Sequence, residues 1–256
     1  MSDRFILTPL FLDEVDEGLK ALLRPSWRMV QPDMPNGDTQ QRIASVHGHL
    51  AKAVADTISR GNRPVSIAGD CCTTLGVLAG LQQSEIAPTL LWIDAHGDLN
   101  NWETSPSGFL GGMPLAMMLG LGEQTIMESL GVKPLETDRI ILTDGRDLDL
   151  GESDLIESLD LRHLPKITDL LETPAPEGPL YVHFDSDILD PADAPAMGYL
   201  APGGPSLADM GRVFKHLAQT YNIVAVSMST WRPKMDEDGS SEKVCMRLLK
   251  DLLASA

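Results

Sequence analysis

The sequence is short of aromatic and basic side chains, and each shortage excludes a class of protein. Only 5% of the 256 residues are aromatic. The chain has 20 Lys and Arg residues and 37 Asp and Glu residues, which gives a formal charge of −17. Nucleic acids and anionic membrane surfaces need a basic footprint, so neither is expected as the main partner. Hydrophobic residues still make up 43% of the chain, which is too many for a disordered acidic tail.

Cysteines and long apolar runs are also scarce. The three cysteines, Cys71, Cys72 and Cys245, are odd in number and two of them are adjacent, which makes a poor disulfide framework. Residues 1–10 lack the basic start and apolar core of a signal peptide. No segment has the about 18 uninterrupted apolar residues of a membrane helix. We therefore expect a cytoplasmic protein that has no membrane segment.

Short apolar runs alternate with segments of helical periodicity along the whole chain. Strands are expected at 5–10, 64–69, 90–95, 139–143, 180–187 and 223–230, and helices at about 39–60, from Ser206 onward and at about 241–253. This alternation predicts an α/β fold with an open, mostly parallel sheet and helices on both faces. The length suits one large domain covering residues 1–256.

Acidic residues gather directly after the expected strands, where sheets of this kind bind ligands. The most suggestive clusters are Asp94, His96 and Asp98 after one strand and Asp185 and Asp187 after another. In an extended segment, residues two positions apart point the same way, so each cluster can face one centre. Carboxylates and imidazole together suit divalent metal ions. Either cluster alone is also common as a helix cap or turn, but the pair favours a site for two metals.

Several motifs resemble those of one family, and they occur in order and with matching spacing from about 65 to 235. Residues 94–98 (Asp-Ala-His-Gly-Asp) resemble the D-A-H-x-D motif of the ureohydrolases, which include arginase, agmatinase and formiminoglutamase. Residues 184–191 resemble the second motif, S-F-D-x-D-x-x-D-P, and residues 68–71 resemble the first motif, G-G-D-H. Residues 145–152 are similar to the family's R-D-x-D-x-x-E stretch. Residues 195–198 are similar to P-A-x-G, and residues 203–204 are similar to G-G.

The resemblance implies a three-layer α/β/α fold and a binuclear manganese centre. It also implies that a metal-bridging hydroxide hydrolyses a guanidine or amidine C–N bond of a small molecule. In this scheme Asp94 and Asp185 bridge the two ions, and His96 and Asp187 complete the second site. Asp98 completes the first site and hydrogen-bonds the hydroxide, which makes it the candidate catalytic residue.

The chain departs from the family at the first metal site, where Cys71 replaces the His of G-G-D-H. A thiolate is a softer ligand that suits zinc better than manganese. The first site is then weakened for manganese, altered in its metal preference, or empty. Two Mn²⁺ ions are expected, with Zn²⁺ or a single metal as alternatives. The other interpretation is that Cys71 is a small buried hydrophobe.

Two more departures concern the substrate. The family has a guanidinium-pairing Glu in E-x-x-P where this chain has Thr230, and arginases carry a proposed proton-shuttle His where this chain has Gly111. A buried cation without its carboxylate binds poorly, so plain L-arginine is not the expected substrate. An N-hydroxyguanidine, a formimino group or a ureido group fits better. The residues that match family positions for an amino-acid-like substrate are Asn100, Ser105, Ser107, Asp149 and Glu152.

Other interpretations stay open at this point. The chain could be a catalytically degenerate relative that binds a metal or small molecule or serves as a partner subunit, or a di-metal hydrolase for an unrelated substrate. A homo-oligomer is possible, since relatives form trimers and hexamers. His183 lies in an expected strand and is interpreted as a satisfied core or outer-shell group that faces away from the neighbours of Asp185. Met113, Met117 and Met118 form a stripe at helical spacing that is interpreted as packing.

Overall fold

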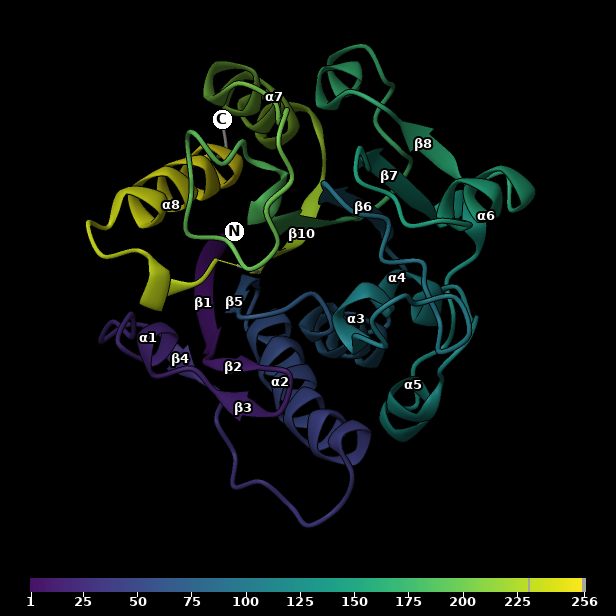
Figure 1. The fold of residues 1–256 in the computed structure, drawn as a ribbon. Coiled ribbons are helices and arrows are strands. Elements are labelled where there is room, and N and C mark those ends of the chain that lie inside the picture. Colours follow the sequence, from purple (N-terminus) through teal and green to yellow (C-terminus); the bar gives the residue numbers. More distant parts are fainter. Residues whose placement is uncertain (230, 255–256) are drawn as a thin grey trace.

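The computed structural model describes residues 1–229 and 231–254, and its centre is one eight-stranded sheet (Figure 1). The strand order is β4-β1-β5-β10-β9-β6-β7-β8, and neighbouring strands pair in parallel. The strands are β1 (Ser2–Thr8), β4 (Arg28–Met29), β5 (Asn62–Ala68), β6 (Thr89–Asp94), β7 (Ile140–Asp144), β8 (Arg162–Leu164), β9 (Leu180–Asp185) and β10 (Ile223–Ser229). A small antiparallel hairpin, β2 (Leu10–Phe11) with β3 (Glu14–Val15), follows β1.

Helices cover both faces of the sheet, which confirms the predicted three-layer α/β/α arrangement (Figure 1). The α-helices are α1 (Glu17–Lys20), α2 (Thr39–Ser59), α3 (Thr73–Gln83), α4 (Pro114–Met118), α5 (Thr125–Leu130), α6 (Glu152–Ser158), α7 (Leu207–Thr220) and α8 (Ser240–Leu253). Short 3-10 turns lie at η1 (Leu110–Gly112), η2 (Thr137–Arg139), η3 (Ile167–Leu171), η4 (Ser186–Ile188) and η5 (Pro233–Met235). None of the helices in these described ranges is long and apolar enough to cross a membrane.

Alternation along the strands divides the core into two clusters. Leu90 and Trp92 of β6 pack into the cluster that contains α2, α3 and α5, whereas Leu91 and Ile93 pack into the cluster that contains α7 and α8. Met113, Met117 and Met118 belong to the first cluster and are fully buried, as the packing interpretation expected.

Local sequence explains where the predicted helices begin. Asp38 caps α2 in a reciprocal arrangement with Gln41: the Asp38 carboxylate accepts from the Gln41 backbone at 2.9 Å, and the Gln41 side chain accepts from the Asp38 backbone at 3.1 Å. Ser206 caps α7 by accepting from the Asp209 backbone at 3.1 Å. Helix α3 was not predicted, because its residues from Thr73 to Leu81 are buried on every side and show no polar face.

The strand order places the carboxyl ends of β5, β10, β9, β6 and β7 next to one another. Each of these ends carries a polar group at or just after its last residue: Cys71 after β5, Ser229 on β10, Asp185 on β9, Asp94 on β6 and Asp144 on β7. These groups come from segments far apart in the sequence. They meet because parallel strands end at the same edge of the sheet.

Candidate metal centre and substrate cavity

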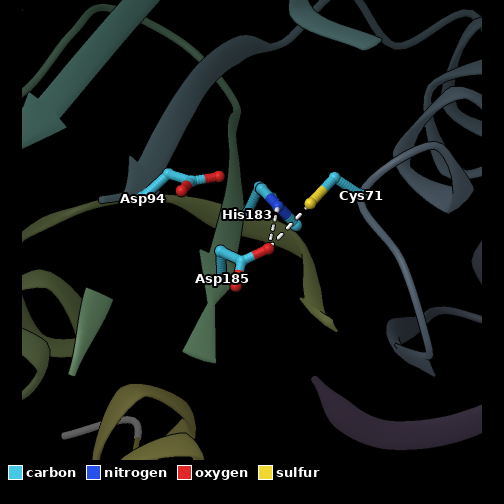
Figure 2. Close-up of side chains that lie close together, drawn as sticks. All are labelled: Cys71, Asp94, His183 and Asp185. Carbon is cyan, nitrogen blue, oxygen red and sulfur yellow. Dashed lines mark hydrogen bonds and ion pairs between the residues drawn. The ribbon is translucent and has the colours of Figure 1, made fainter. Parts of the chain in front are cut away.

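Two groups of side chains at this edge could each hold a metal ion. The first group is Cys71, Asp94, His183 and Asp185 (Figure 2), and the second is Asp94, His96 and Asp187. Within each group, one ligand atom from every residue lies within 4.8 Å of the others. Asp94 belongs to both groups, so its carboxylate is placed to serve two ions.

Local turns hold the carboxylates that end β6 and β9. The His96 backbone donates to Asp94 Oδ1 at 2.7 Å, and the Asp187 backbone donates to Asp185 Oδ1 at 3.0 Å. The second oxygen of Asp94 accepts from the indole of Trp92 at 3.1 Å. Each carboxylate therefore has a fixed orientation before any ligand binds.

The extended geometry that the sequence predicted for the two clusters is wrong beyond the strand ends. Strand β6 stops at Asp94, and Asp98 has a left-handed backbone with φ of 51°. Strand β9 stops at Asp185, and Asp187 lies in the turn η4. Within each of these two clusters, the side chains converge because the backbone turns after the strand and its amide donates to the carboxylate that ends the strand. Strand alternation does not bring them together. Asp98 is buried beside the two groups and lines the cavity described below.

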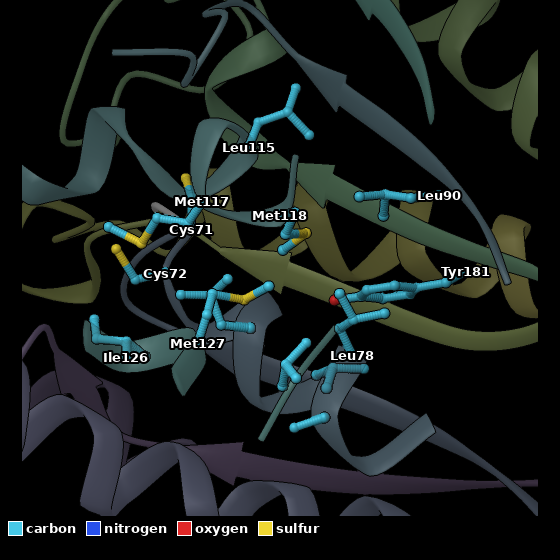
Figure 3. Close-up of a cluster of buried hydrophobic side chains, with 14 of the residues drawn as sticks. Cys71, Cys72, Leu78, Leu90, Leu115, Met117, Met118, Ile126, Met127 and Tyr181 are labelled. Carbon is cyan, nitrogen blue, oxygen red and sulfur yellow. The ribbon is translucent and has the colours of Figure 1, made fainter. Parts of the chain in front are cut away.

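Cys71 places its sulfur among carboxylates. Its thiol donates to Asp185 Oδ2 at 2.7 Å (Figure 2). The Ser229 hydroxyl donates to the same oxygen at 3.0 Å. Burial raises the pKa of the Cys71 thiol well above its usual range, and the nearby carboxylates, led by Asp185, raise it further. Without a cation the group is therefore a neutral thiol. Figure 3 shows Cys71 at the border of the buried cluster, next to Cys72, whose thiol donates to the Leu110 carbonyl at 3.4 Å.

His183 lies in the first group and its Nε2 has no hydrogen-bond partner among the described residues, so the interpretation that it is a satisfied group facing away from the neighbours of Asp185 is wrong. Residues 183 and 185 share one face of β9, and His183 Nε2 lies 3.9 Å from Asp185 Oδ2. The ring packs on Trp92 with centroids 4.2 Å apart, and Nδ1 lies 2.9 Å from Ser227 Oγ. Burial lowers the pKa of His183 to about 4 against the opposing effect of Asp185, so the ring is neutral. The spacing of two residues from Asp185 was the sequence signal that could have found it.

The second group has a compensating charge of its own. His96 Nδ1 lies 3.3 Å from Asp94 Oδ1 and 3.4 Å from Asp187 Oδ2. Burial opposes protonation of this ring, but the two carboxylates outweigh it and raise the pKa of His96 to about 12. Burial raises the pKa of both Asp98 and Asp187 well above the usual range, and neighbouring carboxylates add to the effect.

This donor set fits a pair of divalent cations. Among the described residues, Asp98 Oδ2, Asp187 Oδ1 and His183 Nε2 are buried polar atoms that have no hydrogen-bond partner. Buried groups of this kind are costly unless a ligand or ion satisfies them. Carboxylates crowded in one buried place also repel one another until a cation neutralises them. The second group has only nitrogen and oxygen donors, whereas the first adds a sulfur.

A cavity of about 250 Å³ opens beside the two groups. Its floor is formed by potential ligands, and its walls include all the described residues that the sequence assigned to substrate binding. The walls contain Asn100, Ser105, Ser107, Asp149 and Glu152, and the floor contains Cys71, His96, Asp98 and Asp187. Thr230, the remaining predicted substrate residue, lies outside the described residues.

The predicted substrate residues are also engaged by protein groups, Glu152 most completely. Both oxygens of Glu152 accept backbone amides, from Leu99 at 2.8 Å and from Asp149 at 2.7 Å. Glu152 thus ties the segment after Asp98 to the start of α6. The side-chain amide of Asn100 donates to Asp149 Oδ2 at 2.8 Å, which leaves the other oxygen of Asp149, an exposed residue, for a ligand.

An aromatic wall that the sequence did not predict lines the cavity, formed by Phe11, Phe109 and Tyr199. The rings of Phe11 and Phe109 stack at 5.8 Å, and those of Phe109 and Tyr199 lie 5.1 Å apart. A Cβ atom at Gly111 would collide with the Phe109 ring. Phe109 therefore occupies the space into which a side chain at position 111 would project.

Comparisons with known proteins agree with this geometry. Residues 24–254 match the model of the Arginase family. The arginase of Bacillus caldovelox is 30% identical over 233 residues, which cover 84% of this chain and 78% of the relative. The N(omega)-hydroxy-L-arginine amidinohydrolase of Streptomyces lavendulae is 27% identical over 210 residues, which cover 81% and 74%. The crystal structure of arginase from Bacillus subtilis superposes with a TM-score of 0.83 at 24% identity and covers 100% of this chain and 99% of that chain. The chain therefore belongs to the arginase family, whose members are hydrolases that act on non-peptide C–N bonds.

Proposed function

We propose that this arginase-family hydrolase cleaves the C–N bond of an amino-acid-like N-hydroxyguanidine in preference to L-arginine. The observation that carries the proposal is the position of Phe109, whose ring fills the space beside Gly111. An imidazole at position 111 would shuttle protons in an arginase, and here an apolar ring takes its place. A substrate that is less basic than a guanidinium depends less on such a shuttle. The name of the relative from Streptomyces lavendulae supports the same substrate class.

The metal ligands in this proposal come from the two groups at the sheet edge. Asp94 and Asp185 would contribute to both metal sites, Cys71 and Asp98 would belong to the first, and His96 and Asp187 would belong to the second. Mn²⁺ suits the nitrogen and oxygen donors of the second site, and the thiol of Cys71 admits Zn²⁺ in the first. When bound, the ions supply Lewis acidity, which lowers the pKa of a water molecule and orients it toward a planar substrate carbon.

The protein's own groups bind the substrate and move the proton. Asp98 is buried on the cavity floor with an oxygen that lacks a partner among the described residues, so it is placed to accept a proton from the attacking water and pass it to the leaving amine. Ser105 and Ser107 present hydroxyl groups to the amino-acid end of the substrate, and Asp149 presents a carboxylate to its amino group. The aromatic wall excludes water from one side of the reacting carbon.

A direct comparison of substrates tests the proposal. Protein loaded with Mn²⁺, Zn²⁺ or both is assayed with Nω-hydroxy-L-arginine, L-arginine, agmatine and formimino-L-glutamate. We expect hydroxyurea from the first at a kcat/KM at least about tenfold above urea release from L-arginine, a difference of roughly 1.4 kcal/mol in transition-state binding. Equal or faster turnover of L-arginine contradicts the substrate assignment. No turnover of any of the four compounds by metal-loaded protein favours a binding role without catalysis. We include in the proposal a cytoplasmic location, which the three buried cysteines support because none of them forms a disulfide.

A further inference from the structure

We propose that His183 is a ligand of the first metal site and supplies there the imidazole that position 71 lacks. The family resemblance assigned no role to this residue. The inference depends on the metal centre of the proposed function but not on the choice of substrate.

The position of the ring is that of a ligand. His183 Nε2 lies 3.9 Å from Asp185 Oδ2, and an atom of the ring lies within 4.8 Å of the Cys71 sulfur and of an Asp94 oxygen. Donors that share one zinc ion at bond lengths of about 2.0 to 2.3 Å are roughly 3.3 to 3.7 Å apart. Small side-chain shifts would therefore bring all four donors to one ion (Figure 2).

The other ring nitrogen fixes the orientation of the imidazole. Nδ1 lies 2.9 Å from Ser227 Oγ, which in turn lies 2.7 Å from the hydroxyl of Tyr181. When Nδ1–H donates to Ser227, the lone pair of Nε2 faces the first group. Metal-ligating histidines are held in this way, with one nitrogen on the ion and the other on a protein oxygen.

The described contacts give Nε2 no other role. Its separation of 3.9 Å from Asp185 is too long for a hydrogen bond, and Asp185 Oδ2 already accepts from Cys71 and Ser229. His183 has no exposed surface, and Nε2 has no hydrogen-bond partner among the residues that the structure describes. A buried nitrogen left in this state costs free energy, which a bound cation would recover.

The role of His183 relates two departures from the family motifs, because an imidazole is absent at one position and present at another. Position 71 has Cys where G-G-D-H has His, and position 183 has His where S-F-D-x-D has Ser. The imidazole that the family motif has in the segment after β5 comes here from β9, and both His183 Nε2 and the Cys71 sulfur lie near Asp185 Oδ2. Together with Asp98, which the proposed function places in this site, the donors are one thiolate, one imidazole and three carboxylates, and the sulfur favours Zn²⁺ or Co²⁺ over Mn²⁺.

The first test is a Co²⁺ titration of metal-free protein followed by visible absorption and by metal analysis. His183→Phe keeps the ring packed on Trp92 and removes both nitrogens. His47→Phe is the matched control, because His47 is also a buried histidine with an unpartnered nitrogen but lies on α2, outside both groups. We expect two equivalents in the wild type and in the control. In His183→Phe we expect the thiolate-containing site to bind more than about a hundredfold more weakly, because the loss of an outer-shell partner alone costs 10- to 100-fold.

The second test does not require a variant to fold. X-ray absorption or anomalous diffraction on wild-type protein loaded with Zn²⁺ should place Nε2 about 2.0 to 2.1 Å from an ion. The double variant Cys71→His/His183→Ser, which restores the family residue at both positions, should shift the preference of the site toward Mn²⁺. An ion that binds Cys71 while Nε2 stays beyond bonding distance overturns the inference and leaves the metal centre intact, as does unchanged Co²⁺ affinity in His183→Phe. Wild-type protein that binds neither Co²⁺ nor Zn²⁺ overturns this inference and the metal centre of the proposed function together.

Discussion

The thiol of Cys71 donates a hydrogen bond to Asp185 Oδ2 at 2.7 Å, across 114 positions of the sequence. The Ser229 hydroxyl donates to the same oxygen, so two protons face Asp185 where a cation would lie. The contact stabilises the metal-free site and opposes metal binding, because the thiol must lose its proton before its sulfur can bind an ion. Metal binding and proton release are therefore linked at this residue.

This linkage predicts how metal affinity depends on pH. Because burial and the carboxylates raise the pKa of Cys71, the thiol is protonated at neutral pH, and binding at the first site releases that proton. Zn²⁺ affinity at this site should rise with pH by about tenfold per unit for each proton released. Calorimetric titrations in buffers of different ionisation enthalpy count the protons. Cys71→Ala should release one proton fewer, whereas Cys245→Ala, which removes a buried thiol on α8, should leave the number unchanged. An equal proton count in all three proteins contradicts the prediction.

A second prediction concerns the carboxylate repulsion in the metal-free site. Burial and the nearby Asp185 and Asp94 raise the pKa of Asp187, so the folded state favours its neutral form. The free energy of unfolding of metal-free protein should therefore decrease as pH rises above the ordinary Asp pKa of about 3.9. Asp187→Asn should raise that free energy at pH 7 by about 1 kcal/mol or more, and it should remove most of the stabilisation by Mn²⁺.

Denaturation by urea with EDTA and with excess Mn²⁺ measures both effects. Asp193→Asn is a suitable control, since Asp193 follows the same strand but belongs to neither ligand group. Lower stability of metal-free Asp187→Asn than of the wild type would show that the carboxylates do not repel one another in the folded protein.

The sequence predicted the parts of the fold and site that follow from strands and their ends. Asp94 and Asp185 end two buried strands, and the rule that parallel strands end at one edge was enough to bring them together. The conformation beyond those ends could not be predicted, because the left-handed backbone of Asp98 and the turn at Asp187 depend on hydrogen bonds that have no periodic signature. His183 was misjudged although the signal was present, since residues two apart on a strand share a face.

Other contacts have no signature in a single sequence. Glu152 stands at a motif position, but nothing in the motif shows that two backbone amides occupy its carboxylate. The aromatic wall joins residues from the β2 hairpin and from two loops, and the distances between those loops are set by the whole fold. Its effect on Gly111 appears only when the Phe109 ring is placed in space.

A third prediction follows from that effect. Gly111→His alone should destabilise the protein by about 1 to 3 kcal/mol, because the new side chain forces the Phe109 ring aside. Phe109→Ala should open the space, so the double variant should be more stable than the sum of the two single changes predicts by at least about 1 kcal/mol. Urea denaturation of the four proteins gives the coupling. Additive effects would mean that Phe109 does not occupy the space at position 111.

The last prediction concerns Arg146, whose side chain links the loop after β9 to the end of β7 through hydrogen bonds. Its guanidinium donates to Asp144 Oδ2 at 2.8 Å and to the carbonyls of Ile188 and Ala201 at 3.0 and 2.7 Å. Arg146→Met should lower the free energy of unfolding by about 2 to 4 kcal/mol, because it leaves Asp144 Oδ2 and two carbonyls without their guanidinium donor. It should also speed proteolysis within residues 188–205, which mass spectrometry can locate. The control is Arg212→Met, which breaks an Arg–Asp pair of the same length, 2.8 Å, on the surface. Its side chains are 61% and 39% exposed, compared with 18% and 9% for Arg146 and Asp144. This variant should therefore lower the free energy of unfolding by less than about 1 kcal/mol. Equal losses in the two variants would show that Arg146 contributes only a surface ion pair.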